Sequence, residues 1–247
     1  MIEPKEKTQS YQDYLNKVEE LQNSEGWIIT KKMEPLDLTF HIFNMNRKAL
    51  LASIEKFKEP ESLILWNMRN NEEMDFYLKE VTRQLHNFVA AAKTFIESTH
   101  NIVKSIYGEN REFESEYDAS VKKYITLNPV VQFVHKLRHY ILHKKIPFIV
   151  ANLNSELNTN LKINLIDFRN DLKESNEKKN WNQLSIQFIN SEDDKIIEDI
   201  VRDYSKAILN FHDWLYDKQL KMHKEAFDET NEIKSSIENS SWHIKLK

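Results

Sequence analysis

The sequence contains no cysteine in its 247 residues. This absence excludes a disulfide-stabilised scaffold, a thiol nucleophile and a zinc site with cysteine ligands, and it is compatible with a reducing compartment. Glycine is almost as scarce, with Gly26 and Gly108 alone, and there are five prolines. An all-β fold needs such residues for its tight turns. The sequence therefore favours long helices.

Long apolar runs are also missing. No stretch approaches 18 consecutive apolar residues, and the N-terminal sequence lacks the apolar segment of a signal peptide. We therefore expect a cytoplasmic protein that does not enter a membrane. The composition, 40% hydrophobic and 11% aromatic, is sufficient for a sizeable core. The net charge of −4 excludes a protein whose whole surface attracts nucleic acid, so any such contact must be local.

The spacing of apolar residues predicts a mainly α fold. Between residues 71 and 107 the apolar positions alternate steps of four and three, which predicts the longest helix of a bundle, ending at Gly108. Helical patterns also cover residues 9–24, 38–58, 110–125, 129–145 and about 191–222, with a short helix at 167–174. We predict a bundle of long antiparallel helices.

A change of periodicity after Pro147 predicts a β-hairpin directly after the helix at 129–145. Residues 148–153 are β-prone and residues 161–166 alternate strictly, so the hairpin is expected at about 148–166. We expect a single domain over residues 1–247, with a helical extension at about 1–60 and a bundle core at about 71–230. Residues 175–180 are predicted to form a flexible loop, and Ser191 to Asp194 a capping box that starts the last long helix.

The helix at 129–145 carries the residues of greatest chemical interest. Asn128 is a good N-cap, Pro129 suits the first helical position and Pro147 ends the segment. At about 100° per residue one face is apolar, formed by Val130, Phe133, Val134, Leu137, Tyr140 and Ile141. The opposite face carries Arg138, Leu142, His135, His139 and His143. A leucine among one arginine and three imidazoles predicts a contact surface.

The same helix begins the longest basic region of the sequence. No acidic residue occurs from Val130 to Glu156, and Lys144 and Lys145 follow His143 directly. We identify Lys144, Lys145 and His135 as candidate RNA-binding residues. The alternative is a solvated basic turn, because lysine is favourable at the negative end of a helix dipole.

The string Arg138-His139-Tyr140-Ile141-Leu142-His143 resembles the R-x4-H motif of the HEPN superfamily. The resemblance implies an all-helical protein, often a metal-independent ribonuclease without a cofactor, whose cleft is built from two motif helices of a homodimer. His139 fits the family's preference for Asn, Asp or His at the second motif position. The resemblance also implies a toxin–antitoxin or anti-phage setting, with an antitoxin or defence-complex partner.

The chemistry of RNA cleavage explains why these residue types would be needed. Histidine can exchange a proton near neutral pH, so His143 is a candidate acid or base. Arg138 stays charged and can hold two phosphate oxygens. His139 could orient the substrate or share the proton transfer. The sequence leaves open which histidine is the base and which the acid.

Two other classes of function remain possible from the sequence. The first is a non-catalytic scaffold that binds RNA or protein through the same face, with Leu142 at a homodimer interface. The second is metal binding by His135, His139 and His143, which recur every four residues. Three histidines on one straight helix cannot all reach one tetrahedral ion, so we predict no metal site.

Overall fold

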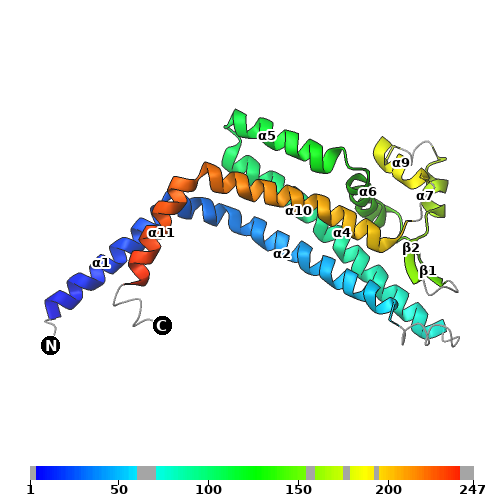
Figure 1. The fold of residues 1–247 in the computed structure, drawn as a ribbon, viewed down its shortest axis with the longest axis horizontal. Helices are drawn as coiled ribbons and strands as arrows, with labels where there is room; N and C mark the ends of the chain where they lie inside the picture. Colours follow the sequence, from blue (N-terminus) through cyan, green and yellow to red (C-terminus); the bar gives the residue numbers. More distant parts are fainter. Residues whose placement is uncertain (1–3, 60–70, 154–158, 175–178, 192–194, 240–247) are drawn as a thin grey trace. The chain divides into compact units, whose positions relative to one another are not determined.

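The computed structural model describes residues 4–59, 71–153, 159–174, 179–191 and 195–239 (Figure 1). It confirms the mainly α fold with a two-stranded hairpin. The elements are α1 Pro4–Asn23, α2 Glu25–Phe57, α4 Asn71–Tyr107, α5 Arg111–Val121, η1 Lys122–Thr126, α6 Pro129–His143, β1 Ile149–Leu153, β2 Thr159–Ile163, α7 Ile166–Asp171, α9 Gln183–Asn190, α10 Ile197–Met222 and α11 Lys224–Glu238. The labels follow Figure 1.

The chain divides into two compact units. One comprises residues 36–212, and the other residues 1–35 together with 213–247. The boundaries fall inside α2 and α10 rather than at residues 60 and 71, where the sequence analysis had separated an N-terminal extension from a bundle core. The candidate site lies entirely within the unit 36–212.

The core of this unit forms where α2, α4 and α10 meet. Figure 1 shows α2 running antiparallel to α4 and α10. The Phe43 ring lies 5.9 Å from that of Phe88 and 6.1 Å from that of Tyr204, and the last two rings are 5.6 Å apart in an edge-on contact. All three side chains are fully buried, and edge-on aromatic pairs add to the free energy gained by burial. The predicted α4 stripe is buried from Val81 to Thr99.

Helix α6 starts as the sequence predicts. The Asn128 side chain accepts hydrogen bonds from the backbone N–H groups of Val130 and Val131, at 3.1 and 3.2 Å, and Pro129 opens the helix. The helix packs against α4 and α9. The preceding segment differs from expectation, because α5 gives way at Lys122 to one turn of π-helix, η1.

The hairpin is confirmed with a shift of its second strand. The strands pair antiparallel, with Ile149 opposite Ile163 and Leu153 opposite Thr159. The second strand ends earlier than predicted, because Asn164 accepts a hydrogen bond from the backbone N–H of Ile166, where α7 begins. A further bond from the Ile163 N–H to the Lys195 carbonyl ties β2 to the segment before α10.

The first helix ends at Asn23, close to the end expected from the pattern at residues 9–24, but the second starts at Glu25 and not at residue 38. Residues 25–57 form one helix, with Pro35 inside it. Gly26 is helical and lies against α11: a Cβ added there would come within 2.5 Å of the Ala226 carbonyl oxygen. The glycine permits close approach of two helices rather than a left-handed end.

Among the helices in the described part of the chain, α9 and α11 were not predicted. Ser191 is the C-cap of α9 and not the start of the next helix. The remaining residues of the predicted capping box, 192–194, lie outside the described residues, as do residues 175–178 of the predicted flexible loop.

Candidate nucleic-acid site

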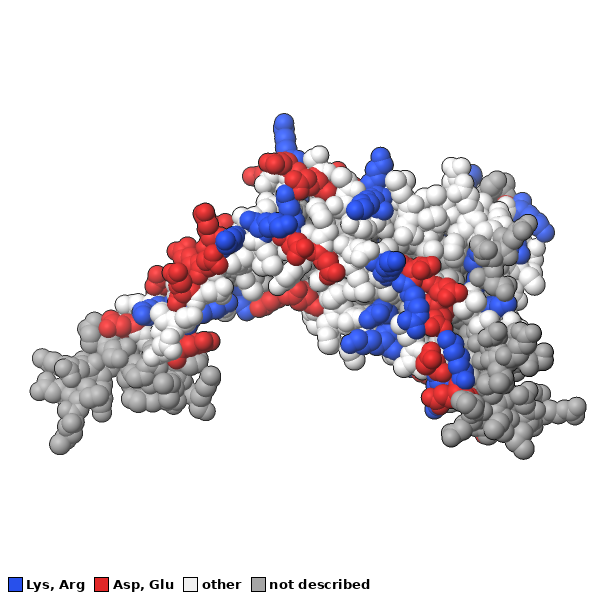
Figure 2. Space-filling view, viewed as in Figure 1, with Lys and Arg blue, Asp and Glu red and all other residues white. Residues whose placement is uncertain are grey.

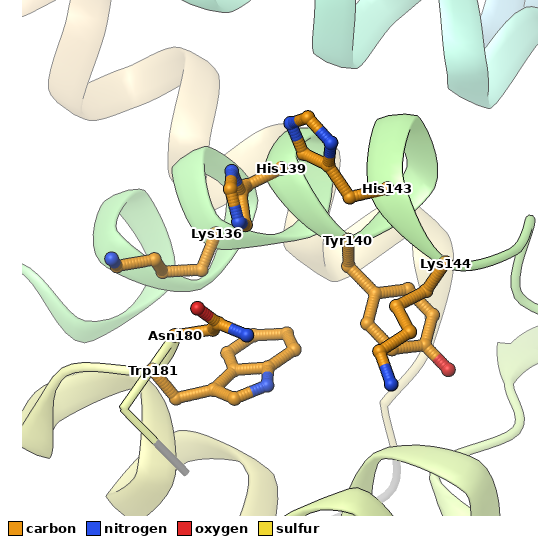
Figure 3. A pocket seen from close by; sticks show the side chains of 7 residues that line it. All are labelled: Lys136, His139, Tyr140, His143, Lys144, Asn180 and Trp181. Carbon is orange, nitrogen blue, oxygen red and sulfur yellow. The ribbon is translucent and has the colours of Figure 1, made fainter. Parts of the chain in front are cut away.

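Two histidines of α6 lie next to each other on its exposed side. His139 and His143 are one turn apart, and their ring centroids are 4.4 Å apart with an angle of 47° between the planes (Figure 3). Both side chains are exposed. The arrangement places two groups that can each hold or release a proton within reach of one small substrate.

A pocket of about 230 Å³ lies between α6 and the turn before α9. Helix α6 provides most of its lining, and the turn provides Asn180 and Trp181 (Figure 3). The α6 residues are Lys136, His139, Tyr140, His143 and Lys144. The volume is below the roughly 300–1,000 Å³ of pockets for drug-sized ligands, so it suits one ring or one small anionic group.

Aromatic packing holds the inner wall of the pocket in place. Trp181 and Tyr140 are buried, with ring centroids 6.0 Å apart. Phe168 of α7 contacts both, at 4.5 Å from Tyr140 and 5.5 Å from Trp181, and Phe133 lies 6.2 Å from Trp181. Because neither ring can turn without displacing a neighbour, the wall is formed before any ligand binds.

Hydrogen bonds fix the second wall to α6. Asn182 is the N-cap of α9, and its side-chain oxygen accepts bonds from the N–H and hydroxyl of Ser185, at 2.9 and 2.6 Å. The Asn182 amide also donates to the side-chain oxygen of Gln132 in α6. The turn that carries Asn180 and Trp181 is therefore tied to the helix that carries the histidines.

The electrostatics of the pocket favour a negatively charged ligand. Its polar lining comprises lysine, histidine and asparagine, and no carboxylate is among the described lining residues. Partial burial lowers the pKa of His139, and the positive charges of His143, Lys136 and Arg138 lower this pKa further. A bound phosphate would relieve that repulsion. Figure 2 shows acidic and basic side chains interspersed over the face it presents. Attraction of a negatively charged ligand would therefore be local and not a property of that whole face.

The structure separates Arg138 from the histidine pair. Arg138 does not line the pocket, as the helical wheel requires, because five positions turn its side chain about 140° away from that of His143. It is half-buried, and among the described residues no carboxylate lies within ion-pair distance of it. Within one chain, Lys136 and Lys144 are the cations at the pocket.

The two lysines at the end of the motif helix have different surroundings. Lys144 lines the pocket. Lys145 forms an ion pair with Asp167 of α7, with a nitrogen-to-oxygen distance of 2.9 Å, so its charge is partly neutralised. Its proposed contact with RNA stays a prediction.

His135 is a correction to the sequence analysis. It was expected on the exposed face, but its Nε2 lies 3.2 Å from the hydroxyl oxygen of Tyr204, a fully buried residue of α10. Burial lowers the pKa of His135 to about 3, and nearby Lys93 lowers it as well. A neutral, enclosed imidazole cannot serve as a cationic contact for RNA. The helical wheel missed this because Tyr204 belongs to another helix, α10.

Leu142 is exposed, at 55% of its surface, as predicted for a contact residue. Other exposed apolar side chains follow it, and along the extended segment the exposed Ile146, Phe148 and Val150 alternate with the buried Pro147 and Ile149. A group of exposed apolar residues of this kind commonly marks an interaction surface. A homodimer formed through this surface stays a prediction.

Asn180 and Trp181 were missed by the sequence analysis. Both lie 37 or more positions after His143, and only the packing of α9 on α6 brings them to the pocket. The one local signal was Asn182, a residue type that starts helices.

Within the described ranges, no group of three histidine, aspartate or glutamate side chains could hold a metal ion. None of the helices described is both long and apolar enough to span a bilayer.

Comparison with known proteins identifies no family for this chain. No family model matches it, and no solved structure does. Over 152 residues, 61% of the chain, it is 28% identical to a protein described as DNA-directed RNA polymerase subunit beta from Eimeria tenella. The match spans 13% of the length of that relative.

Proposed function

We propose that this protein is a metal-independent endoribonuclease of the HEPN type whose proton-transferring groups are His139 and His143. The observation that carries the proposal is the adjacency of these two exposed imidazoles, 4.4 Å apart, beside a pocket lined by Lys136 and Lys144. The sequence motif from Arg138 to His143 supports the same assignment.

The reaction needs two proton transfers. One imidazole takes the proton of the ribose 2′-OH as its oxygen attacks phosphorus, and the other donates a proton to the departing 5′ oxygen. The products are a 2′,3′-cyclic phosphate and a 5′-hydroxyl. The lowered pKa of His139 favours its neutral form, which is the form that a base requires. His143 is then the acid.

The position of Arg138 supports a site shared by two chains. Its side chain does not line the pocket, and it diverges by about 140° around α6 from that of His143. A two-fold axis near the exposed Leu142 would bring Arg138 of a second copy toward the first copy's histidines. Arginine is suited to the charge that develops on the phosphate oxygens.

A second candidate is RNA binding without cleavage. The same separation of Arg138 from the pocket favours it, because one chain alone provides cations and imidazoles but no arginine at the phosphate. The possible setting in toxin–antitoxin or anti-phage systems, with a protein partner, rests on the family resemblance.

The experiment is a cleavage assay on single-stranded RNA in the presence of EDTA, with analysis of the product ends. The proposal predicts cleavage that survives the chelator, leaves a cyclic phosphate and a 5′-hydroxyl, and spares DNA of the same sequence, which lacks the 2′-OH. Binding without cleavage by the wild type would favour the second candidate. Loss of activity with EDTA, or a 5′-phosphate product, would contradict the mechanism.

A further inference from the structure

The pocket beside the histidine pair has one feature that the cleavage chemistry does not need, its aromatic wall. Its inner wall is aromatic, formed by Tyr140 and Trp181, whereas its rim carries Lys136, Lys144 and the two histidines. In Figure 3 the indole of Trp181 and the amide of Asn180 lie on the side of the pocket opposite α6, with the basic side chains along the helix. Proton transfer alone would require only the rim.

The aromatic wall and the basic rim of the pocket match the base and the phosphate of a nucleotide. Proteins that bind single-stranded RNA place unstacked bases against aromatic side chains and read base edges with amides. The rim supplies charges for the phosphate, because Lys and His⁺ are donors to phosphate oxygens. A pocket of about 230 Å³ has room for one base and not for a helical segment of RNA.

We propose that this pocket is a subsite for one nucleotide, with the base against Tyr140 and Trp181, its edge at the Asn180 amide, and the adjoining phosphate at His139 and His143. The inference rests on the proposed function in taking RNA as the substrate. It adds that the protein recognises an unpaired nucleotide at the cleavage point, and that Asn180 determines which base is preferred.

The rigidity of the wall makes the subsite specific in shape. Tyr140 and Trp181 are packed by Phe168, and the turn is tied to α6 through Asn182 and Gln132. A preformed wall costs little ordering on binding. A base held there must leave its neighbours in the strand, so duplex RNA should bind poorly.

Binding can be measured without cleavage. The chain has five tryptophans, and of those that the structure describes Trp181 alone lines the pocket. Each indole N–H gives its own signal in a nitrogen–proton correlation spectrum, so the signal of Trp181 can be followed separately. Trp181→Phe assigns its signal. The four nucleoside 3′-monophosphates are titrated in turn, with inorganic phosphate and the uncharged nucleosides as matched probes.

The proposed subsite predicts that a nucleotide shifts the Trp181 signal more strongly than inorganic phosphate or the uncharged nucleoside does. Asn180→Ala should weaken binding of the preferred nucleotide by roughly 5- to 150-fold and reduce the differences among bases, because the pairing of an amide with a base edge discriminates by about that factor. Lys144→Ala should weaken all four nucleotides alike. Asn101→Ala, an exposed asparagine on α4, is the control and should change nothing.

The outcomes separate the two proposals. A nucleotide-dependent shift that Asn180→Ala weakens supports the subsite, even if the wild type cleaves no RNA. RNA cleavage with no shift of the Trp181 signal by any nucleotide would overturn the subsite and leave the nuclease. Equal shifts by inorganic phosphate and by all four nucleotides would also overturn it, because the pocket would then bind only an anion.

Discussion

At the scale of residues, three histidines on one helix occupy two kinds of environment. His135 is enclosed beside Tyr204, whereas His139 and His143, one and two turns later, face solvent and the pocket. The same residue type is therefore a neutral packing residue at one position and an exposed side chain at the next. The difference comes from the contact of His135 with Tyr204 of α10, which no periodicity within α6 records.

Protonation of His135 should couple stability to pH. Its pKa is about 3 when folded and about 6.5 when unfolded. Between these values the unfolded chain binds a proton that the folded chain does not, so the free energy of unfolding falls as pH decreases, by up to about 1.4 kcal/mol per pH unit. Above about pH 6.5 the full stability is present. Denaturant melts from pH 7.5 to 4 should show the decline.

His135→Gln supplies the control for this coupling. Glutamine can keep a hydrogen bond to Tyr204 but does not titrate. The variant protein should therefore lose less stability between pH 6.5 and 4 than the wild type does. Parallel pH curves for the two proteins would mean that His135 does not carry the effect. His41→Gln, on an exposed position of α2, should leave the curve unchanged.

At the scale of elements, α6 depends on its first turn. Asn128 satisfies two of the backbone N–H groups that every helix start leaves without an intrahelical partner. The α6 residues that line the pocket follow about two to four turns later.

Asn128→Ala should therefore destabilise the protein by about 1 kcal/mol, the usual cost of removing an N-cap side chain. Asn128→Ser should retain most of the stability, because its hydroxyl can accept the same bonds. Chemical denaturation of the three proteins tests this. An alanine variant as stable as the wild type would show that the cap contributes nothing measurable.

The sequence predicted those elements whose signals are local. The α4 stripe, the α6 cap and the alternation in the hairpin can each be interpreted within a dozen residues, and the structure has all three. Gly26 was misinterpreted because its reason lies on α11, about 200 residues away. Likewise, Asn180 and Trp181 in the turn before α9 join the site only through tertiary packing. The propensity of a segment to form a turn does not reveal which residues that turn will contact.

At the scale of the whole molecule, the exposed apolar surface around Leu142 bears on assembly. The exposed Leu142 lies between the pocket residues and Arg138 around α6, and exposed Ile146 and Phe148 continue from it along the chain. If two chains meet through this surface, one substitution should damage both assembly and cleavage. The apolar face with Leu137 would be left intact.

Leu142→Glu is the test of this assembly. Two like charges at a desolvated contact cost several kcal/mol, enough to convert a micromolar dimer largely to monomer at working concentration. Light scattering should show the loss of the dimer, circular dichroism an unchanged helix content, and the RNA assay a loss of cleavage. A Leu142→Glu protein that stays fully dimeric would exclude this interface, and an active monomer would exclude the shared site.

The central claim is that His143 takes part in cleavage without supporting the fold, and His143→Ala tests it most directly. The side chain is exposed, so its removal leaves no cavity. We expect RNA cleavage to fall by at least about 10²-fold, the usual share of an acid or base, while the melting temperature matches that of His41→Ala, an exposed histidine on α2. Cleavage at the wild-type rate by folded His143→Ala protein would contradict the account.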